Sequence, residues 1–200
     1  TGGKDFIFVH KSAVPDQVAT AITRGAFEYQ GQKCSAASRA YIPKSLWPSI
    51  KKTVLKQLAE VKLGDPTDFS NFMNAVIDRG AYDSIKKYVD FAKKATDAEI
   101  ISGGNCDDSK GYYIDATLIE TSNPKFKTME EEIFGPVLSI MKADDFDQAV
   151  EFINDSRYGN AASLFTNNGK HAREFKYRVN AGNIGINVGV AAATASFPFG

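Results

Sequence analysis

Short apolar runs alternate with longer stretches of helical periodicity along this chain, and this alternation limits the folds open to it. Residues 6–9 (FIFV) precede a stretch from about 14 to 29 with apolar residues at helical spacing, and 39–43 precede a similar stretch at 45–61. Pro15 suits the first turn of the first helix. Strands alternating with helices of this length build α/β folds, so we predict a three-layer domain with a largely parallel sheet.

The same alternation continues toward the carboxyl terminus. We predict helices at 81–95, 146–154 and 169–179, strands at 99–102, 112–114, 117–119, 137–141, 161–165 and 183–188, and a polar loop at 106–111. No repeat or Pro/Gly/Ser-rich linker divides the sequence, so we predict one domain over residues 1–200. Ligand sites of parallel sheets form at the carboxyl ends of strands, and we expect a site there.

Charge and composition argue against several classes of partner. The 24 basic and 24 acidic residues give a formal net charge of zero, which does not favour nucleic acid. We find no apolar run of membrane-spanning length and no signal peptide in TGGKDFIFVH, and expect no membrane partner. Two histidines and two distant cysteines predict neither a metal site nor a secreted disulfide framework. We therefore expect a reducing compartment, the cytoplasm or, in a eukaryote, the mitochondrial matrix.

The segment 27–39 (FEYQGQKCSAASR) places a cysteine, Cys34, in a turn of small and polar residues. Gly31 permits a tight turn, and the small residues after the cysteine leave space around its sulfur. Cysteines kept for packing more often lie among large apolar residues, so we expect an exposed thiol. A lone cysteine is either a nucleophile or an incidental thiol, and both interpretations stay open at this point. Cys106 lies in a polar, acidic segment and is interpreted as incidental.

Three segments, in order and spacing, resemble motifs of the aldehyde dehydrogenase family. Phe27, Gly31 and Cys34 stand as in its active-site signature. The segment 129–137 (MEEEIFGPV) is similar to the family's E-x-F-G-P-V segment, which contacts the nicotinamide riboside. Residues 1–4 (TGGK) are similar to the end of the E-x-G-G-K motif that carries the general base.

The resemblance implies a role for each matching position. Cys34 would be the catalytic nucleophile, Glu132 would bind the ribose hydroxyls of NAD or NADP, and Phe134 would pack beside the nicotinamide ring. The general-base glutamate would immediately precede Thr1, so we expect no general base within these residues. The cofactor-binding half of the enzyme would also precede Thr1.

Different parts of the sequence resemble two branches of the family. The first two-thirds resemble the pyrroline-5-carboxylate branch, which oxidises glutamate semialdehyde, whereas the part from about residue 144 onward resembles the methylmalonate-semialdehyde branch. In the first branch a serine after the cysteine and backbone N–H groups of a late loop bind the substrate carboxylate. Carried over to this sequence, these positions are Ser35, Ala191 and Ala192, and Phe199 would line the aliphatic chain.

The resemblance thus implies the catalytic half of an NAD-dependent enzyme of proline catabolism, homo-oligomeric in its parent form. It would oxidise a small aldehyde, glutamate semialdehyde, to glutamate through a thiohemiacetal and a thioester on Cys34. Two alternatives are a CoA-acylating (methyl)malonate-semialdehyde dehydrogenase and a truncated half that folds but is inactive. A cysteine hydrolase would need a histidine base, for which only His10 and His171 are available.

Overall fold

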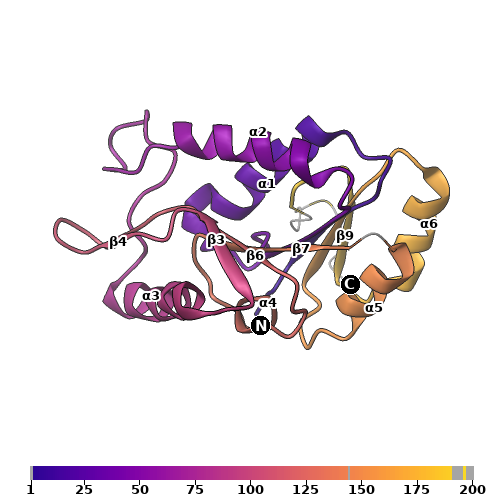
Figure 1. The fold of residues 1–200 in the computed structure, drawn as a ribbon. Coiled ribbons are helices and arrows are strands. Elements are labelled where there is room, and N and C mark those ends of the chain that lie inside the picture. The colour runs from indigo at the N-terminus through magenta and orange to yellow at the C-terminus, as the bar shows by residue number, and fades with distance from the viewer. Residues whose placement is uncertain (1, 144, 191–195, 197–200) are drawn as a thin grey trace.

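The computed structural model describes residues 2–143, 145–190 and 196, and within them a seven-stranded sheet lies between two layers of helices (Figure 1). The strands run in the order β3-β6-β7-β2-β1-β8-β9. Their bounds are β1 (Phe6–Val9), β2 (Arg39–Ile42), β3 (Ala98–Ser102), β6 (Thr117–Thr121), β7 (Val137–Lys142), β8 (Ala161–Phe165) and β9 (Asn183–Ile186). Neighbouring strands are parallel, except that the edge strand β3 is antiparallel to β6. The predicted α/β class is confirmed.

The helices cover both faces of the sheet, and each covered face has its own apolar core. The helices are α1 (Pro15–Phe27), α2 (Trp47–Glu60), α3 (Arg79–Lys94), α4 (Lys127–Glu130), α5 (Phe146–Asn154) and α6 (Gly169–Arg178). Figure 1 shows α1 and α2 on one side of the sheet and α3, α4 and α5 on the other. Ile7 joins the core beneath α1 and α2, and its neighbour Phe8 joins the opposite core, because successive strand side chains alternate. No helix among the described residues is long and apolar enough to cross a membrane.

Most predicted elements are confirmed, several of them to the residue: β1, α5 and β8 have the predicted bounds. Two short elements differ from the prediction. The four-residue helix α4 was not expected, and the predicted loop at 106–111 begins with a two-residue strand, β4 (Cys106–Asp107), paired with β5 (Tyr113–Ile114). Neither element is long enough to show a periodicity of its own.

The amino ends of the central strands meet at one edge of the sheet. Phe6 of β1 pairs with Arg39 of β2 and Ala162 of β8, and Arg39 pairs with Ser139 of β7. Because these strands are parallel, the segments that enter them converge at this edge. These segments are 2–5, 32–38, 131–136 and 155–160.

Candidate active site

Cys34 lies in the turn between α1 and β2, and its side chain is exposed, as predicted. A 3₁₀ turn, Glu28–Gly31, follows α1, and Tyr29, Gln30 and Gly31 all have positive φ. This left-handed stretch reverses the chain toward β2. The cysteine turn is attached to α1, because Ala37 N donates to Gly25 O of that helix at 2.9 Å.

Gly31 brings the cysteine turn against the segment that enters β7. A Cβ atom on Gly31 would lie 2.4 Å from the Gly135 carbonyl oxygen, and its φ is +63°. The positive φ favours glycine, and the contact with backbone excludes any side chain. The close approach places the residues before Gly135, including Glu132 and Phe134, beside the thiol-bearing turn.

One small pocket is shared by three of the residues that the sequence singles out. Its lining consists of Gly3, Gly31, Lys33, Cys34, Ala36, Ala37, Ser38, Glu132, Phe134 and Gly135. Glu132 Oε1 accepts a hydrogen bond from Gly3 N at 2.7 Å, which fixes the carboxylate beside the amino-terminal segment. Phe134 has a φ of 56°, and its side chain is 45% exposed. A thiol, a carboxylate and an accessible aromatic ring therefore surround one cavity.

This pocket lies at the amino ends of β1, β2 and β7, so the expectation of a site at the carboxyl ends was wrong. Close glycine contacts at Gly3 and Gly31 draw the entering segments together at this edge. At the carboxyl end of β1, aromatic side chains pack against one another. His10, directly after β1, stacks on His171 at 4.2 Å, and Phe146 meets His171 edge-on at 4.9 Å.

Buried ionisable side chains lie directly beneath the pocket. Lys4 is 1% exposed, and its Nζ donates to Ser38 Oγ at 2.6 Å. Burial, assisted by Arg39, lowers the pKa of Lys4 well below its usual value. Asp5 accepts hydrogen bonds from Ala161 N at 3.0 Å and from Asn160 Nδ2 at 2.9 Å. Burial nevertheless raises the pKa of Asp5 to about 7.

Two residues that contact the cysteine turn were missed by the sequence analysis, Asp5 and Asn160. Asn160 Nδ2 donates to the Cys34 carbonyl oxygen at 3.1 Å, and Asp5 O accepts from Ser38 N at 2.9 Å. Each is a polar residue at the start of an apolar strand, and this was the only available signal. A polar residue before a strand does not indicate which part of the chain its side chain will contact.

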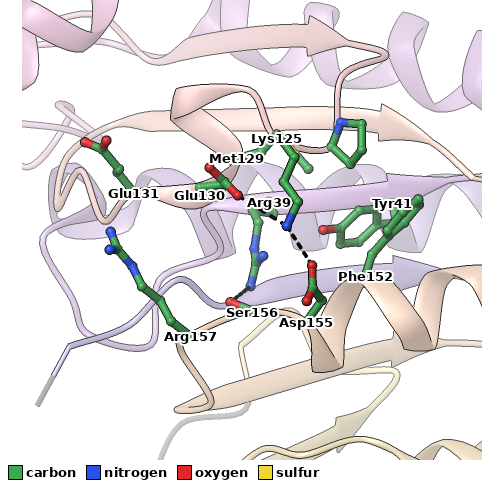
Figure 2. Close-up of a pocket in the computed structure, with 11 residues that line it drawn as sticks. Arg39, Tyr41, Lys125, Met129, Glu130, Glu131, Phe152, Asp155, Ser156 and Arg157 are labelled. Carbon is green, nitrogen blue, oxygen red and sulfur yellow. Dashed lines mark hydrogen bonds and ion pairs between the residues drawn. The ribbon is translucent and has the colours of Figure 1, made fainter.

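Arg39 connects this edge to a second pocket, of about 270 Å³, shown in Figure 2. Arg39 Nε donates to Lys4 O at 3.0 Å, and Nη2 donates to Ser156 Oγ at 3.1 Å. Lys125 lines the same pocket and pairs with Asp155 at 2.6 Å. The loop from α5 to β8 is therefore held from two sides.

The predicted substrate residues are only partly described. Ser35 is half-buried next to Cys34 but is not among the residues that line the pocket. Ala191, Ala192 and Phe199 lie outside the described residues. The chain just before them returns to the cysteine turn: a Cβ on Gly25 would lie 2.8 Å from the Gly189 carbonyl oxygen. Gly25 is the residue whose own carbonyl holds the turn.

The remaining thiol and the histidines lie elsewhere. Cys106 is half-buried, and burial raises its thiol pKa, with Asp90 and Asp115 adding to the shift. His10 Nδ1 contacts Ser12 Oγ at 2.9 Å and Thr166 Oγ1 at 3.1 Å. The contacts of both histidines are at the carboxyl edge of the sheet, opposite Cys34. A histidine base for a cysteine hydrolase is therefore not placed at the thiol.

Comparison with known proteins identifies relatives over the whole chain. Residues 1–200 match the aldehyde dehydrogenase family. The mitochondrial delta-1-pyrroline-5-carboxylate dehydrogenase of Dictyostelium discoideum is 47% identical over 193 residues, 94% of this chain and 34% of that protein. Its counterpart from Danio rerio is 44% identical over 100% of this chain and 37% of its own length.

A solved structure, 1-pyrroline-5-carboxylate dehydrogenase from Thermus with bound NAD, has a TM-score of 0.92 and 31% identity, covering 100% of this chain and 38% of that one. The chain thus spans somewhat over a third of the length of the relatives it matches. The comparisons do not show the predicted resemblance of the last part to the methylmalonate-semialdehyde branch: the Danio relative, a delta-1-pyrroline-5-carboxylate dehydrogenase by name, matches the whole chain. With its sequence, its sheet and its cysteine turn all in agreement, the chain belongs to the aldehyde dehydrogenase family.

Proposed function

We propose that this chain is the catalytic part of an NAD-dependent aldehyde dehydrogenase that oxidises glutamate semialdehyde, the open form of pyrroline-5-carboxylate, to glutamate. The observation that carries the proposal is the shared pocket, in which the exposed Cys34 thiol lies with Glu132 and Phe134. The names of the relatives support the choice of substrate. The bound NAD of the Thermus relative supports the choice of cofactor.

The pocket itself is small, about 10 Å³, and its side chains carry the groups that would hold the nicotinamide half of NAD at its opening. Glu132 uses Oε1 to accept from Gly3 N, which leaves Oε2 to accept from a ribose hydroxyl. The accessible ring of Phe134 offers an apolar surface beside the thiol. When bound there, NAD would accept a hydride from the substrate carbon. Glu132 and Phe134 would orient the nicotinamide toward Cys34.

Cys34 would carry the substrate through two covalent stages. Its thiolate attacks the aldehyde carbon and forms a C–S bond. The carbonyl π electrons move to the oxygen, which becomes an oxyanion. The backbone N–H of Cys34 would donate to that oxyanion. Once hydride has left, the acyl group remains on sulfur as a thioester. The general-base residue expected before Thr1 would then activate a water molecule. The water attacks the thioester carbon, the C–S bond breaks, and the product glutamate and the Cys34 thiol are released.

Substrate selection would depend on the distal carboxylate. The Ser35 hydroxyl, next to the nucleophile, would donate to this carboxylate together with the N–H groups of Ala191 and Ala192. Phe199 would line the aliphatic chain between the two ends. A hydrogen bond to a charged group contributes about 1.5–3 kcal/mol, enough for a clear preference among semialdehydes.

The test uses the full-length protein with pyrroline-5-carboxylate and NAD. We expect NADH formation without CoA, and a loss of at least about a thousandfold in Cys34→Ser. Cys106→Ser is the matched control, because this half-buried thiol lies away from the pocket, and its activity should stay within about twofold. Turnover that requires CoA, or a Cys34→Ser variant with full activity, would contradict the proposal.

The assembly and location of the parent protein are also proposals. We propose a homo-oligomer, in the mitochondrial matrix if the source is eukaryotic and in the cytoplasm otherwise. The names of the Dictyostelium and Danio relatives, both called mitochondrial, support the first location. Light scattering of the purified protein tests the assembly, since a monomeric mass would contradict it.

A further inference from the structure

A single side-chain amide joins the cysteine turn to the sheet beneath it. Asn160, the residue before β8, has one amide nitrogen within hydrogen-bond distance of two acceptors: Asp5 Oδ2 at 2.9 Å and the Cys34 carbonyl oxygen at 3.1 Å. The two hydrogens of an amide group can serve two acceptors at once. The sheet therefore holds the carbonyl of the nucleophilic residue itself.

Asp5 holds the same turn at its other end. Its backbone oxygen accepts from Ser38 N at 2.9 Å and from Arg39 N at 3.2 Å, where the turn enters β2. Its carboxylate accepts from Ala161 N and from the Asn160 amide. One residue at the start of β1 thus holds the turn at two points, directly at Ser38 and through Asn160 at Cys34.

The loop that carries Asn160 is itself anchored. Figure 2 shows Arg39 reaching Ser156 and Lys125 reaching Asp155, and these contacts measure 3.1 and 2.6 Å. Ser156 Oγ also accepts from Tyr158 N at 3.3 Å, which closes the loop on itself. An anchored donor can fix the orientation of its acceptor, whereas a mobile one cannot.

We propose that Asn160, oriented by the Asp5 carboxylate, is a positioning residue for Cys34: by holding the Cys34 carbonyl, it fixes the turn that aims the thiol at the substrate. The inference rests on the proposed function. A peptide group is planar, so fixing its carbonyl fixes the direction of the next backbone N–H as well. The close contact of Gly3 with the same carbonyl limits the turn from the other side. Asn160 contacts the Cys34 carbonyl oxygen and is not among the residues that line the pocket.

The ionisation of Asp5 gives this arrangement a pH dependence. Burial raises its pKa from 3.8 to about 7, the hydrogen bonds from Ala161 and Asn160 and the charge of Arg39 oppose the shift, and Glu132 adds to it. Lys4, next to Asp5 in the chain, is buried as well. Both carboxylate oxygens accept hydrogen bonds, and protonation would place a hydrogen on one of them. The link to Asn160 should therefore weaken as the pH falls below about 7.

Keeping Asp5 ionised in this place costs stability. The pKa of Asp5 is higher in the folded protein than in the unfolded chain, so the unfolded chain loses its proton first as the pH rises. The folded protein is therefore most stable, as far as Asp5 is concerned, below pH 3.8, where Asp5 is protonated in both states. This contribution to the free energy of unfolding is lost as the pH rises to about 7. Groups with strongly shifted pKa values cluster at functional sites, which agrees with the place of Asp5 beside the cysteine turn.

The experiment compares the full-length wild type with Asn160→Ala, Asp5→Asn and a matched control, Asn105→Ala. Asn105 Nδ2 also donates to an aspartate, Asp115, at 2.8 Å, but in the β4–β5 hairpin region. Two quantities are measured against pH: kcat and KM for aldehyde oxidation, and the alkylation rate of Cys34 read by peptide mass. Alkylation needs no turnover, and folding of each variant is checked by its circular dichroism spectrum.

In Asn160→Ala we expect kcat to fall about tenfold with KM within about twofold, because the orientation of the thiol is lost while substrate binding is kept. Wild-type kcat should decline below about pH 7, and the ratio of wild-type to Asn160→Ala labelling rates should fall to one there. Asp5→Asn should match the wild type at low pH, and Asn105→Ala should match it throughout. Equal kcat, or a labelling ratio that does not change with pH, would overturn the proposal. A wild type without turnover contradicts the proposed function alone, since the labelling ratio still tests Asn160.

Discussion

At the scale of single residues, the site depends on a backbone contact that leaves no room for a side chain. A Cβ atom on Gly3 would lie 2.1 Å from the Cys34 carbonyl oxygen. Because the obstacle is backbone, Gly3→Ala must push the cysteine turn away from β1. We expect a loss of about 1–3 kcal/mol in the free energy of unfolding. We also expect slower labelling of Cys34.

The matched control for this prediction is Gly169→Ala. Gly169 opens α6, and a Cβ there would meet nothing within 4 Å, so neither stability nor labelling should fall. Both quantities can be measured by urea denaturation and by timed alkylation with peptide mass analysis. If Gly3→Ala labels at the wild-type rate, the contact of Gly3 with Cys34 does not set the turn.

The sequence predicted some residues of the pocket and missed others, for a physical reason. Cys34, Glu132 and Phe134 each stand in a local motif that can be read without the fold. Asn160 contacts Asp5, which lies 155 positions earlier in the chain, and Cys34, which lies 126 positions earlier. Such contacts depend on which strands become neighbours, and no local pattern contains that information.

At the scale of elements, the helix boundaries follow from capping chemistry. Asp78 precedes α3, and its side chain accepts from Ala81 N at 2.7 Å, which satisfies one of the free N–H groups of the first turn. Asp78→Ala should lower the free energy of unfolding by about 1 kcal/mol. Thermal or urea unfolding of the purified protein measures this difference.

Asp83, one turn into α3, provides the comparison for the cap. Its carboxylate lies 3.7 Å from Arg79 in an exposed pair, so Asp83→Ala should change stability by less than about 0.5 kcal/mol. Equal effects of the two substitutions would show that the Asp78 cap does not stabilise α3 beyond the loss of surface charge.

Elements with a clear period were predicted well, and those without one were not. The amphipathic helices and the apolar strands carry their pattern in their own residues, as α5 and β8 show. The helix α4 has four residues, little more than one turn, and β4 has two. Their geometry comes from neighbours: Met129 of α4 is buried in the core beneath α3, and β4 exists only through its pairing with β5.

At the scale of the whole molecule, the order of strands in the sheet differs from their order in the sequence. The first strand, β1, lies between β2 and β8, and β8 begins about 150 residues later. Strand existence was predictable from composition, but this order arises from long-range parallel pairing. The edge of the pocket, in contrast, could have been predicted: residues 1–4, the cysteine turn and the segment from Glu132 each precede a predicted strand, at 6–9, 39–43 and 137–141. It was predicted wrongly because the general rule for parallel sheets was applied instead.

The central place of β1 makes one last prediction possible. Ile7 is 0% exposed and belongs to the core under α1 and α2, whereas Ile77 is 79% exposed in the loop before α3. Ile7→Ala removes the same atoms as Ile77→Ala, but only the first leaves a cavity between two layers. We expect a cost of about 2–5 kcal/mol for Ile7→Ala and less than about 0.5 kcal/mol for Ile77→Ala, by urea denaturation. Phe8→Ala should be as costly as Ile7→Ala, because Phe8 fills the opposite core; a tolerated Phe8→Ala would mean that one face of β1 is not covered as the three-layer arrangement requires.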